Sequence, residues 1–411
     1  MKRVCVLLVG EVLEDPRVLR TCQSLAAAGA EVTVGCTNPS GRPEAETAGP
    51  LSIRRFPHRR EFIVKRLYEH LHALVHPRIG RIMAGGHENV PVSPIAARVR
   101  NLLVSLNFRR YLTETVRINR AMADAFDRET FDLVHANDVD TLHAGVALKT
   151  NGSAKTLVYD AHEYWAGIGV RGSRPNDELR KLEREGCSHA DHLVTVSPQI
   201  AGRLAEDYDL PVTPSVMLNC PERYDGSVYV DTVHAPVRVV YQGMFKAFRG
   251  LAELVEAFSL IDDAELTLSG YGPLENGLRR LTDSLGIADR VHFAGRFYPG
   301  ENMALLAQHD IGVMTFRDVT MNMVYVAPNK LFDYAMAGCA VVGSRMPFLE
   351  STIGGYGMGM IFDEITPRGI ADTLSRFIVD AEKIRECKQN ARAAALETFT
   401  WEKQFAANYP W

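Results

Sequence analysis

The stretch that decides the fold is RVCVLLVGEVLEDPRVLRTCQSLAAAGAEVTVGC, residues 3–36. An apolar run ends at Gly10, apolar side chains then recur at helical spacing from Val18 to Ala26, and a second apolar run follows Gly29. Strand, helix and strand within about 35 residues form a βαβ unit, which implies a parallel sheet. The sequence therefore predicts an α/β fold, and we expect the first run to be a buried strand and not a signal peptide.

The same alternation continues along the chain in two series. Further strands are expected at 131–138, 155–164, 191–199 and 215–221, and a second series begins at 237. Between the two series, residues 213–237 are rich in Pro, Asp, Gly and Ser and lose periodicity, which is typical of a domain junction. We therefore predict two Rossmann-like, doubly wound parallel-sheet domains, 1–215 and 216–398, that face a central cleft outside the carboxyl ends of their strands.

Composition limits the classes of function. The 411 residues suffice for two or three domains of about 150 residues each. A net charge of −4 gives no general attraction to nucleic acid, and no apolar window reaches the ~18 residues of a membrane-spanning helix. Seven cysteines without close spacing predict reduced thiols in the cytoplasm, with neither a disulfide framework nor a zinc site.

Charge is uneven in one segment of the chain. Residues 54–110 hold twelve Lys and Arg against three Asp and Glu, interleaved with Phe and Leu. Three interpretations are open: a basic amphipathic surface at a membrane, a grip on an anionic acceptor, or an ordinary solvated pair of helices.

One expected helix start suggests an anion site. In YVAPNKLFDYAMAGCAVVGS, residues 325–344, Pro328 suits the first helical position. The amides expected to point out of the helix start are those of Asn329, Lys330 and Leu331, where the helix dipole favours phosphate. Lys330 and Asp333 share a face, which fits a nucleotide diphosphate with Lys330 at the phosphates and Asp333 at the ribose. Alternatively, Asp333 merely offsets the helix dipole, worth roughly 0.3–1 kcal/mol.

A glycine-rich loop follows the first expected strand of the second series. In YQGMFKAFRGL, residues 241–251, Gly243 would allow close backbone approach. Lys246 and Arg249 lie in the loop before the next helix, where they could donate charge-assisted hydrogen bonds to phosphate oxygens. The alternative is a solvated basic loop.

A second glycine-rich loop tests for a dinucleotide site. In LSGYGPLENG, residues 268–277, Gly270 and Gly272 match the start of the G-x-G-x-x-G pattern, but Glu275 stands where its third glycine belongs. The mismatch argues against a dehydrogenase. The alternative that this segment is a glycine turn beside a nucleotide stays open.

Titratable residues gather at strand ends of the first series. VYDAHEYW, residues 158–165, ends a strand with Asp160, His162 and Glu163, while Asp138 ends the preceding strand. Two carboxylates around a histidine could be acid–base machinery or metal ligands, although no further ligand lies nearby in sequence. The alternative is a histidine satisfied by a neighbouring carboxylate.

Taken together, these motifs resemble the retaining, nucleotide-sugar-dependent glycosyltransferases of family 4 (group 1), which have the two-domain GT-B fold. The resemblance covers nearly the whole chain and rests on YQGMFKAFRGL, LTLSGYGPLENGL, VHFAGRF and VYVAPNKLFDYAMAGCAVVGS in this order, with YDAHEYW in the N-terminal half. It implies an N-terminal acceptor-binding domain and a C-terminal domain that binds the nucleotide sugar. FTWEKQF resembles the family's last helix, so residues 399–411 are expected to pack back on the N-terminal domain.

The resemblance also implies roles for individual residues. His162 would line the reacting centre, and Arg249 and Lys330 would act in catalysis by stabilising the departing diphosphate. The donor would be bound by Gly10, Gly243, Lys246, Gly272, Arg296, Phe297, Tyr325, Asn329, Leu331 and Asp333. Asp333 matches the ribose-binding second carboxylate of the family's E-x7-E pair, whereas Tyr325 stands in place of the first, so donor identity is open. The acceptor-site candidates are Asp15, Arg17 and Asp138, which we place on strand-end loops facing the expected cleft.

The chemistry that the resemblance implies is transfer of a hexosyl-type sugar to an acceptor hydroxyl with retention, by a front-face displacement. We find no Asp-x-Asp at a strand end that is suited to a metal–diphosphate bridge, so neither a metal nor another cofactor is expected. The expected partners are a nucleotide diphosphate sugar and an acceptor saccharide, lipid-linked or small, and not nucleic acid. On the membrane interpretation of residues 54–110, peripheral contact with the inner face of the membrane is also expected. Two alternatives stay open: a nucleotide-sugar 2-epimerase, and a catalytically silent nucleotide-sugar-binding subunit, which Tyr325 favours.

Overall fold

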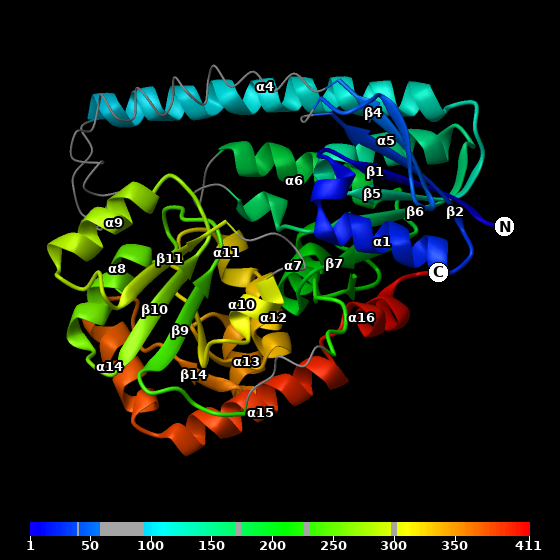
Figure 1. Ribbon diagram of the computed structural model, residues 1–411. Coiled ribbons are helices and arrows are strands. Elements are labelled where there is room, and N and C mark those ends of the chain that lie inside the picture. The colour runs from blue at the N-terminus through cyan, green and yellow to red at the C-terminus, as the bar shows by residue number, and fades with distance from the viewer. Residues whose placement is uncertain (39–40, 58–93, 169–173, 226–230, 297–301) are drawn as a thin grey trace.

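The structure is a computed structural model of residues 1–411 that describes all of them except 39–40, 58–93, 169–173, 226–230 and 297–301 (Figure 1). For residues 94–109 and 174–176 it describes the backbone alone. Most of the basic segment 54–110 lies outside the described residues, so the three interpretations of that segment stay predictions.

The N-terminal sheet has the strand order β3-β4-β2-β1-β5-β6-β7-β8. Its strands are β1 (Arg3–Leu8), β2 (Glu31–Thr37), β3 (Ala45–Ala48), β4 (Leu51–Phe56), β5 (Phe131–Asn137), β6 (Ala154–Ala161), β7 (His192–Thr195) and β8 (Ser215–Val216). All neighbours pair in parallel except β3, which is antiparallel to β4. The βαβ unit predicted from residues 3–36 is confirmed, because β1 and β2 pair in parallel on either side of α1.

Helices connect these strands. They are η1 (Val12–Glu14), α1 (Pro16–Ala27), α4 (Pro94–Phe126), α5 (Val139–Thr150), η2 (Trp165–Gly167), α6 (Arg174–Cys187) and α7 (Pro198–Tyr208). Helix α1 begins where the sequence favours it: the Asp15 carboxylate caps the amides of Arg17 and Val18, and Pro16 takes the first position.

The C-terminal sheet has the doubly wound order β11-β10-β9-β12-β13-β14. Its strands are β9 (Val237–Gln242), β10 (Ala264–Ser269), β11 (Val291–Gly295), β12 (Ile311–Met314), β13 (Ala340–Gly343) and β14 (Gly359–Ile361). Its helices are α8 (Leu251–Ala257), η3 (Phe258–Leu260), α9 (Glu275–Ser284), α10 (Asn302–Leu306), α11 (Met321–Tyr325), α12 (Asn329–Ala337), α13 (Pro347–Gly355), α14 (Pro367–Ile378) and α15 (Ala381–Glu397). The predicted pair of parallel-sheet α/β domains is therefore confirmed.

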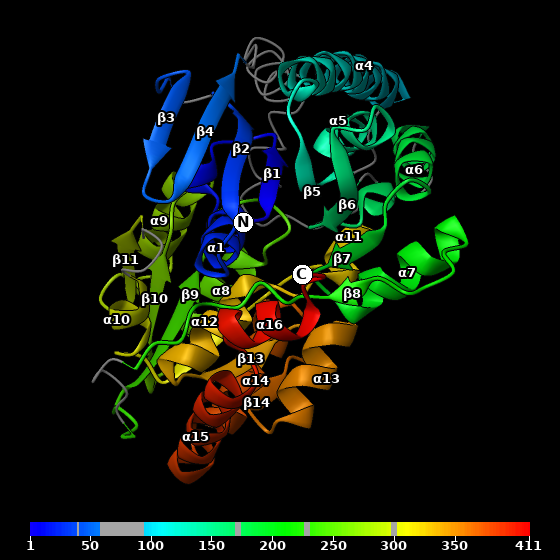
Figure 2. The same ribbon diagram turned by 90° about the vertical axis from the view of Figure 1, so that its right-hand side faces the viewer.

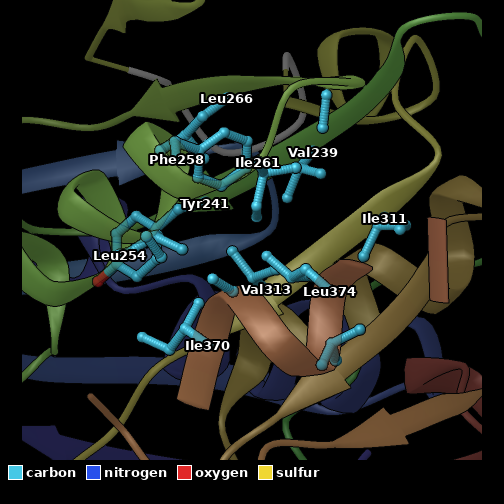
Figure 3. Close-up of a cluster of buried hydrophobic side chains, with 14 of the residues drawn as sticks. Val239, Tyr241, Leu254, Phe258, Ile261, Leu266, Ile311, Val313, Ile370 and Leu374 are labelled. Carbon is cyan, nitrogen blue, oxygen red and sulfur yellow. The ribbon is translucent and has the colours of Figure 1, made fainter. Parts of the chain in front are cut away.

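Each sheet is covered by apolar side chains from helices on both faces. On one face of the C-terminal sheet, Leu254 of α8 and Leu374 of α14 pack with Val239 and Val313 of the strands (Figure 3). These side chains are fully buried. This packing holds the carboxyl ends of β9 and β12 in place, and the candidate site is built on them.

The chain crosses between the domains twice. Met217 packs in the N-terminal core and Leu218 in the C-terminal core, so the first crossing lies directly after β8. The second crossing follows α15, and α16 (Trp401–Asn408) lies against α1 of the N-terminal domain (Figure 2). There Trp401 Nε1 donates to Ser24 Oγ at 2.9 Å.

Two local expectations need correction. The sequence did not predict the β3–β4 hairpin, and Arg55, counted there in a basic segment, is a buried strand residue paired with Glu11 at 2.7 Å. Pro328 is the residue before α12 and not its first residue, because its backbone is extended (φ −75°, ψ 130°). Among the described residues, no helix combines the length and apolar character that crossing a membrane requires.

Candidate active site

Two cations lie over the same aromatic ring at the carboxyl ends of β9 and β12. Lys330 Nζ is 4.0 Å from the centre of the Tyr241 ring and 5.3 Å from that of Phe316, and Arg249 Cζ is 4.7 Å from the Phe316 centre. Within the described part of the chain, neither cation has a carboxylate within ion-pair distance. Two cations side by side without a carboxylate partner repel each other, and an anionic ligand between them would relieve that repulsion.

The electrostatics of Lys330 agree with an anion site. Burial lowers the pKa of Lys330 well below its usual value, the charge of Arg249 lowers it further, and Asp333 only partly opposes this. The ammonium is therefore poorly solvated and lies close to a like charge. An anionic ligand would remove both penalties.

The loops after β9 and β10 pack closely against each other beside the two cations. A Cβ on Gly243 would lie 2.9 Å from Lys330 Nζ, and a Cβ on Gly270 would lie 1.9 Å from the Gly243 carbonyl oxygen. A Cβ on Gly272 would lie 2.5 Å from the carbonyl oxygen of Phe245. A side chain at Gly270 or Gly272 would push the loops after β9 and β10 apart, whereas a side chain at Gly243 would displace the Lys330 ammonium.

Arg249 is presented by a strained turn. Phe248 and Gly250 both have left-handed backbones, with φ of 65° and 61°, which is costly for phenylalanine. The carbonyl oxygens of Phe248 and Arg249 accept hydrogen bonds from Arg317 N at 3.2 Å and Thr315 Oγ1 at 2.6 Å. These two bonds hold the turn that places the Arg249 guanidinium over Phe316.

The start of α12 differs in one detail from the prediction. The Leu331 amide donates to the Pro328 carbonyl at 3.0 Å, so it is not available to a phosphate, and its side chain is fully buried. Asn329 is exposed at the helix start and precedes Lys330. The predicted phosphate contact of Leu331 is therefore corrected, whereas those of Asn329 and Lys330 stay predictions.

Asp333 lies one turn into α12. Its Oδ2 accepts from Gln242 Nε2 at 3.2 Å. Burial raises the pKa of Asp333 to about 6, although Arg20 of α1, Gln242 and Lys330 act in the opposite direction. Asp333 therefore lies within electrostatic range of a cation of the N-terminal domain.

The N-terminal side of the site is a histidine between two carboxylates. His162 Nδ1 lies 3.5 Å from Asp138 Oδ2, and its Nε2 lies 3.3 Å from Asp160 Oδ2. Burial lowers the pKa of His162, but the two carboxylates outweigh it and raise the value to about 9. His162 is therefore an imidazolium at neutral pH and can donate hydrogen bonds, but it cannot accept a proton.

Asp138 holds this arrangement at a backbone cost. Its φ of 59° and ψ of 170° lie in a region that almost only glycine occupies. Its Oδ1 accepts from the His162 amide at 2.9 Å and from Trp165 Nε1 at 2.8 Å. Asp138 thus fixes the loop after β6, and the strained backbone of Asp138 itself lies beside His162.

The other two acceptor-site candidates have structural partners. The Asp15 carboxylate caps α1. Arg17 is 2% exposed and uses three donor nitrogens on Asp160 and on the carbonyl oxygen of Met217. All three guanidinium nitrogens of Arg17 therefore have protein partners, and Asp160 connects Arg17 to His162.

The remaining predicted donor contacts lie at the edges of the two sheets. Gly10 lies two residues beyond the end of β1, and its carbonyl oxygen accepts from the Thr37 amide at 3.1 Å. Lys246 is exposed on the loop after β9, and Arg296 lies over the Tyr271 ring at 4.6 Å. Phe297 lies outside the described residues.

Tyr325 joins the two domains. Its ring lies 5.9 Å from the Tyr164 ring, and its carbonyl oxygen accepts from Ser197 Oγ at 2.7 Å. Next to it, the Asn322 side chain donates to Glu163 Oε2 and accepts from the Tyr164 amide at 2.8 Å. The ring of Tyr325 thus packs against the N-terminal domain, and its predicted contact with the donor stays a prediction.

Several contributors to the site were not found from the sequence. Phe316 and Tyr241 support the two cations, Thr315 pins Arg249, and Asn322 binds across the domain boundary. The only local signal for Phe316 was its position directly after an apolar run, and Asn322 had none.

One sequence observation about metals needs correction. Asp138-Val139-Asp140 is an Asp-x-Asp at the end of β5, but its carboxylates are engaged: Asp140 Oδ1 accepts from the Tyr111 hydroxyl at 2.7 Å, and Asp138 holds His162 and Trp165. Among the described residues, no group of three His, Cys, Asp or Glu side chains is placed to hold a metal ion.

Comparison with protein families covers both halves of the chain. Residues 17–221 match the family described as Glycosyltransferase Family 4, and residues 234–394 match the family described as Glycosyl transferases group 1. A stretch of 106 residues is 31% identical to the lipopolysaccharide core biosynthesis glycosyltransferase LpsD of Rhizobium meliloti (strain 1021), covering 25% of this chain and 31% of that protein. That alignment therefore spans about a third of the curated relative's length.

Solved structures resemble the chain along nearly its whole length. Sucrose-phosphate synthase from Thermosynechococcus elongatus has a TM-score of 0.65 at 16% identity, covering 98% of this chain and 96% of that chain. Anabaena HepE in complex with UDP has a TM-score of 0.65 at 14% identity, covering 98% and 97%. The α,α-trehalose-phosphate synthase (UDP-forming) from Burkholderia vietnamiensis has a TM-score of 0.63 at 12% identity, covering 98% and 97%. At these identities the likeness concerns the fold.

Proposed function

For a chain that carries a Glycosyltransferase Family 4 domain followed by a group 1 domain on a GT-B fold, we propose transfer of a sugar from a nucleotide diphosphate sugar to an acceptor hydroxyl. The observation that carries this proposal is the pair of cations over Phe316. Lys330 and Arg249 have no carboxylate within ion-pair distance in the described part of the chain. Arg249 lies on the loop after β9, which Gly270 and Gly272 allow to pack closely against the loop after β10, and Lys330 lies at the start of α12. A diphosphate supplies the charge that this pair lacks.

The same cations would drive the chemistry. When the bond between the sugar and the diphosphate breaks, negative charge collects on the leaving phosphate, and Lys330 and Arg249 are already in position to stabilise it. Because these groups are fixed before the reaction, little reorganisation is needed. We propose that they replace a metal ion in this role and that no other cofactor takes part.

His162 would act as a cation. Its pKa of about 9 keeps it protonated at neutral pH, so it could donate a hydrogen bond to substrate but could not remove the acceptor's proton. The leaving phosphate is then the base available to take that proton, which places the acceptor on the same face as the leaving group. We therefore propose transfer with retention of configuration.

The nucleotide and the acceptor can be proposed by class. Asp333 lies one turn beyond Lys330 on α12, which suits a ribose hydroxyl when the diphosphate is at the helix start. HepE and the trehalose-phosphate synthase are described with UDP, so a uridine donor is the first to test. The partial likeness to LpsD favours a saccharide acceptor, and lipid-linked and small forms are both consistent with it.

Turnover assays with the donor alone and with donor and acceptor together test the proposal. The purified protein is given a panel of nucleotide sugars with and without saccharide acceptors, and released nucleotide diphosphate and the product anomer are measured. We expect release that depends on the acceptor and a product that keeps the donor's anomeric configuration. Formation of an epimer without acceptor would indicate a 2-epimerase instead, and tight nucleotide binding without turnover on any acceptor would indicate a silent subunit.

A further inference from the structure

Glu163 lies directly after His162 and is held by a residue of the opposite domain. Asn322 of α11 donates through Nδ2 to Glu163 Oε2 and accepts through Oδ1 from the Tyr164 amide at 2.8 Å. One side chain of the C-terminal domain thus fixes both the Glu163 carboxylate and the backbone that follows it. Among the described residues, the Glu163 carboxylate accepts a side-chain hydrogen bond from Asn322. A carboxylate has roughly four acceptor positions, so most of those of Glu163 stay free for a ligand.

Helix α11 has further contacts that bind it to the N-terminal domain. Ser197 Oγ donates to the Tyr325 carbonyl at 2.7 Å, and the Tyr164 and Tyr325 rings are 5.9 Å apart. At the other end of the helix, a Cβ on Gly167 would lie 2.9 Å from Met321 Cβ. The observed position of Glu163 is therefore supported by contacts between the two domains.

The charges around Glu163 come from both halves of the site. Burial raises its pKa and Asp138 raises it further, whereas Asn322, His162 and Arg249 lower it. Arg249 belongs to the C-terminal domain, whereas His162 precedes Glu163 in the N-terminal domain. The Glu163 carboxylate therefore lies within electrostatic range of charges from both domains. In a nucleotide sugar, the sugar ring is bonded to the diphosphate through its reacting carbon. With the diphosphate at Arg249, the sugar ring is the part of the donor that would lie next to His162 and Glu163.

We propose that Glu163 binds a hydroxyl group of the transferred sugar and that Asn322 positions it for this when the domains close. The inference rests on the proposed function, since it takes the diphosphate to lie at Lys330 and Arg249. A carboxylate accepts hydrogen bonds from hydroxyls and offers selectivity between sugars, because a site built for a hydroxyl discriminates against an analogue that lacks it. Glu163 would therefore determine which donor sugar the protein accepts.

Binding of donor and of its nucleotide diphosphate, measured separately, tests this inference. Calorimetry is run with UDP, UDP-glucose and other nucleotide sugars, and with monodeoxy forms of the best donor, on the wild type, Glu163→Gln, Asn322→Ala and the control Glu185→Gln, an exposed glutamate of α6. We expect Glu163→Gln and Asn322→Ala to weaken nucleotide-sugar binding at least about tenfold while changing nucleotide diphosphate binding less than about twofold. One monodeoxy donor should lose a similar factor on the wild type and nothing more on Glu163→Gln.

The outcomes separate the two proposals. If the wild type binds no nucleotide diphosphate, the proposed function fails and this inference fails with it. If the wild type binds it, but Glu163→Gln weakens sugar-free and sugar-bearing ligands equally or keeps the full deoxy penalty, only this inference is overturned.

A pH profile tests the positioning role of Asn322. Because Asn322 lowers the pKa of Glu163, its removal should move the acidic limb of kcat/KM toward higher pH. An unchanged acidic limb with a merely lower Tm would show that Asn322 only supports the structure.

Discussion

Arg17 and Asp160 form a two-point ion pair in the N-terminal core, 143 residues apart in sequence. Arg17 Nε is 3.0 Å from Asp160 Oδ2, and Arg17 Nη2 is 2.8 Å from Oδ1. Asp160 Oδ2 also lies 3.3 Å from His162 Nε2. The position and charge of His162 therefore depend on the buried Arg17–Asp160 pair.

Replacing Arg17 by methionine should destabilise the protein strongly. Both partners are almost fully buried, and removal of one leaves the Asp160 charge without its partner in the core. We expect the free energy of unfolding to fall by about 3–5 kcal/mol in urea denaturation. Arg120→Met is the matched control, because Arg120 is exposed on α4, and it should change the free energy by less than about 0.5 kcal/mol. Equal effects of the two variants would contradict the structural role of the pair.

The raised pKa of His162 makes a prediction about stability and pH. The folded-state pKa is about 9 against 6.5 for an unperturbed histidine, so the stabilisation by the imidazolium is fully present below pH 6.5 and is lost as the pH rises through 9. The difference in unfolding free energy between the wild type and His162→Gln should therefore shrink over that window, by on the order of 3 kcal/mol. NMR titration of the imidazole gives a direct reading, and a pKa at or below 6.5 would contradict the two-carboxylate arrangement.

Gly270 and Gly277 should respond in opposite ways to alanine. A Cβ on Gly270 would lie 1.9 Å from the Gly243 carbonyl oxygen, so Gly270→Ala must separate the loops that support Lys330. We expect a lower Tm and at least about tenfold weaker binding of nucleotide diphosphate. Gly277 lies in α9 with no atom within 4 Å of its Cβ position, so Gly277→Ala should stabilise the protein by up to about 1 kcal/mol. Normal nucleotide binding by Gly270→Ala would show that the loop contact is dispensable.

The sequence predicted those parts of the fold that depend on local pattern. Short β-branched runs that end in glycine, such as the one at Gly243, marked the strands, and helical spacing marked the connections between them. The hairpin of β3 and β4 was missed because Arg54 and Arg55 made its alternating strand resemble a basic surface segment. The burial of Arg55 depends on Glu11, which is distant in sequence.

The candidate site was predictable where a motif carried it and not where two domains meet. Lys330, Arg249 and Gly243 come together as expected because each lies at the end of a parallel strand or the start of its helix. Arg17 looked available on a strand-end loop, but it lies in α1 and donates to Asp160 of β6 and to the carbonyl oxygen of Met217. The contact between Asn322 and Glu163 has no local signature, since it exists only through the packing of one domain on the other.

The central claim is that Lys330 binds the diphosphate of a nucleotide sugar, and calorimetric titration with nucleotide diphosphates tests it most directly. For Lys330→Met we predict binding weaker by a factor of about ten or more than in the wild type, because a charge-assisted hydrogen bond to phosphate is lost. The control Lys383→Met, on the exposed surface of α15, should bind within about twofold of the wild type. Unchanged affinity in Lys330→Met would contradict the account.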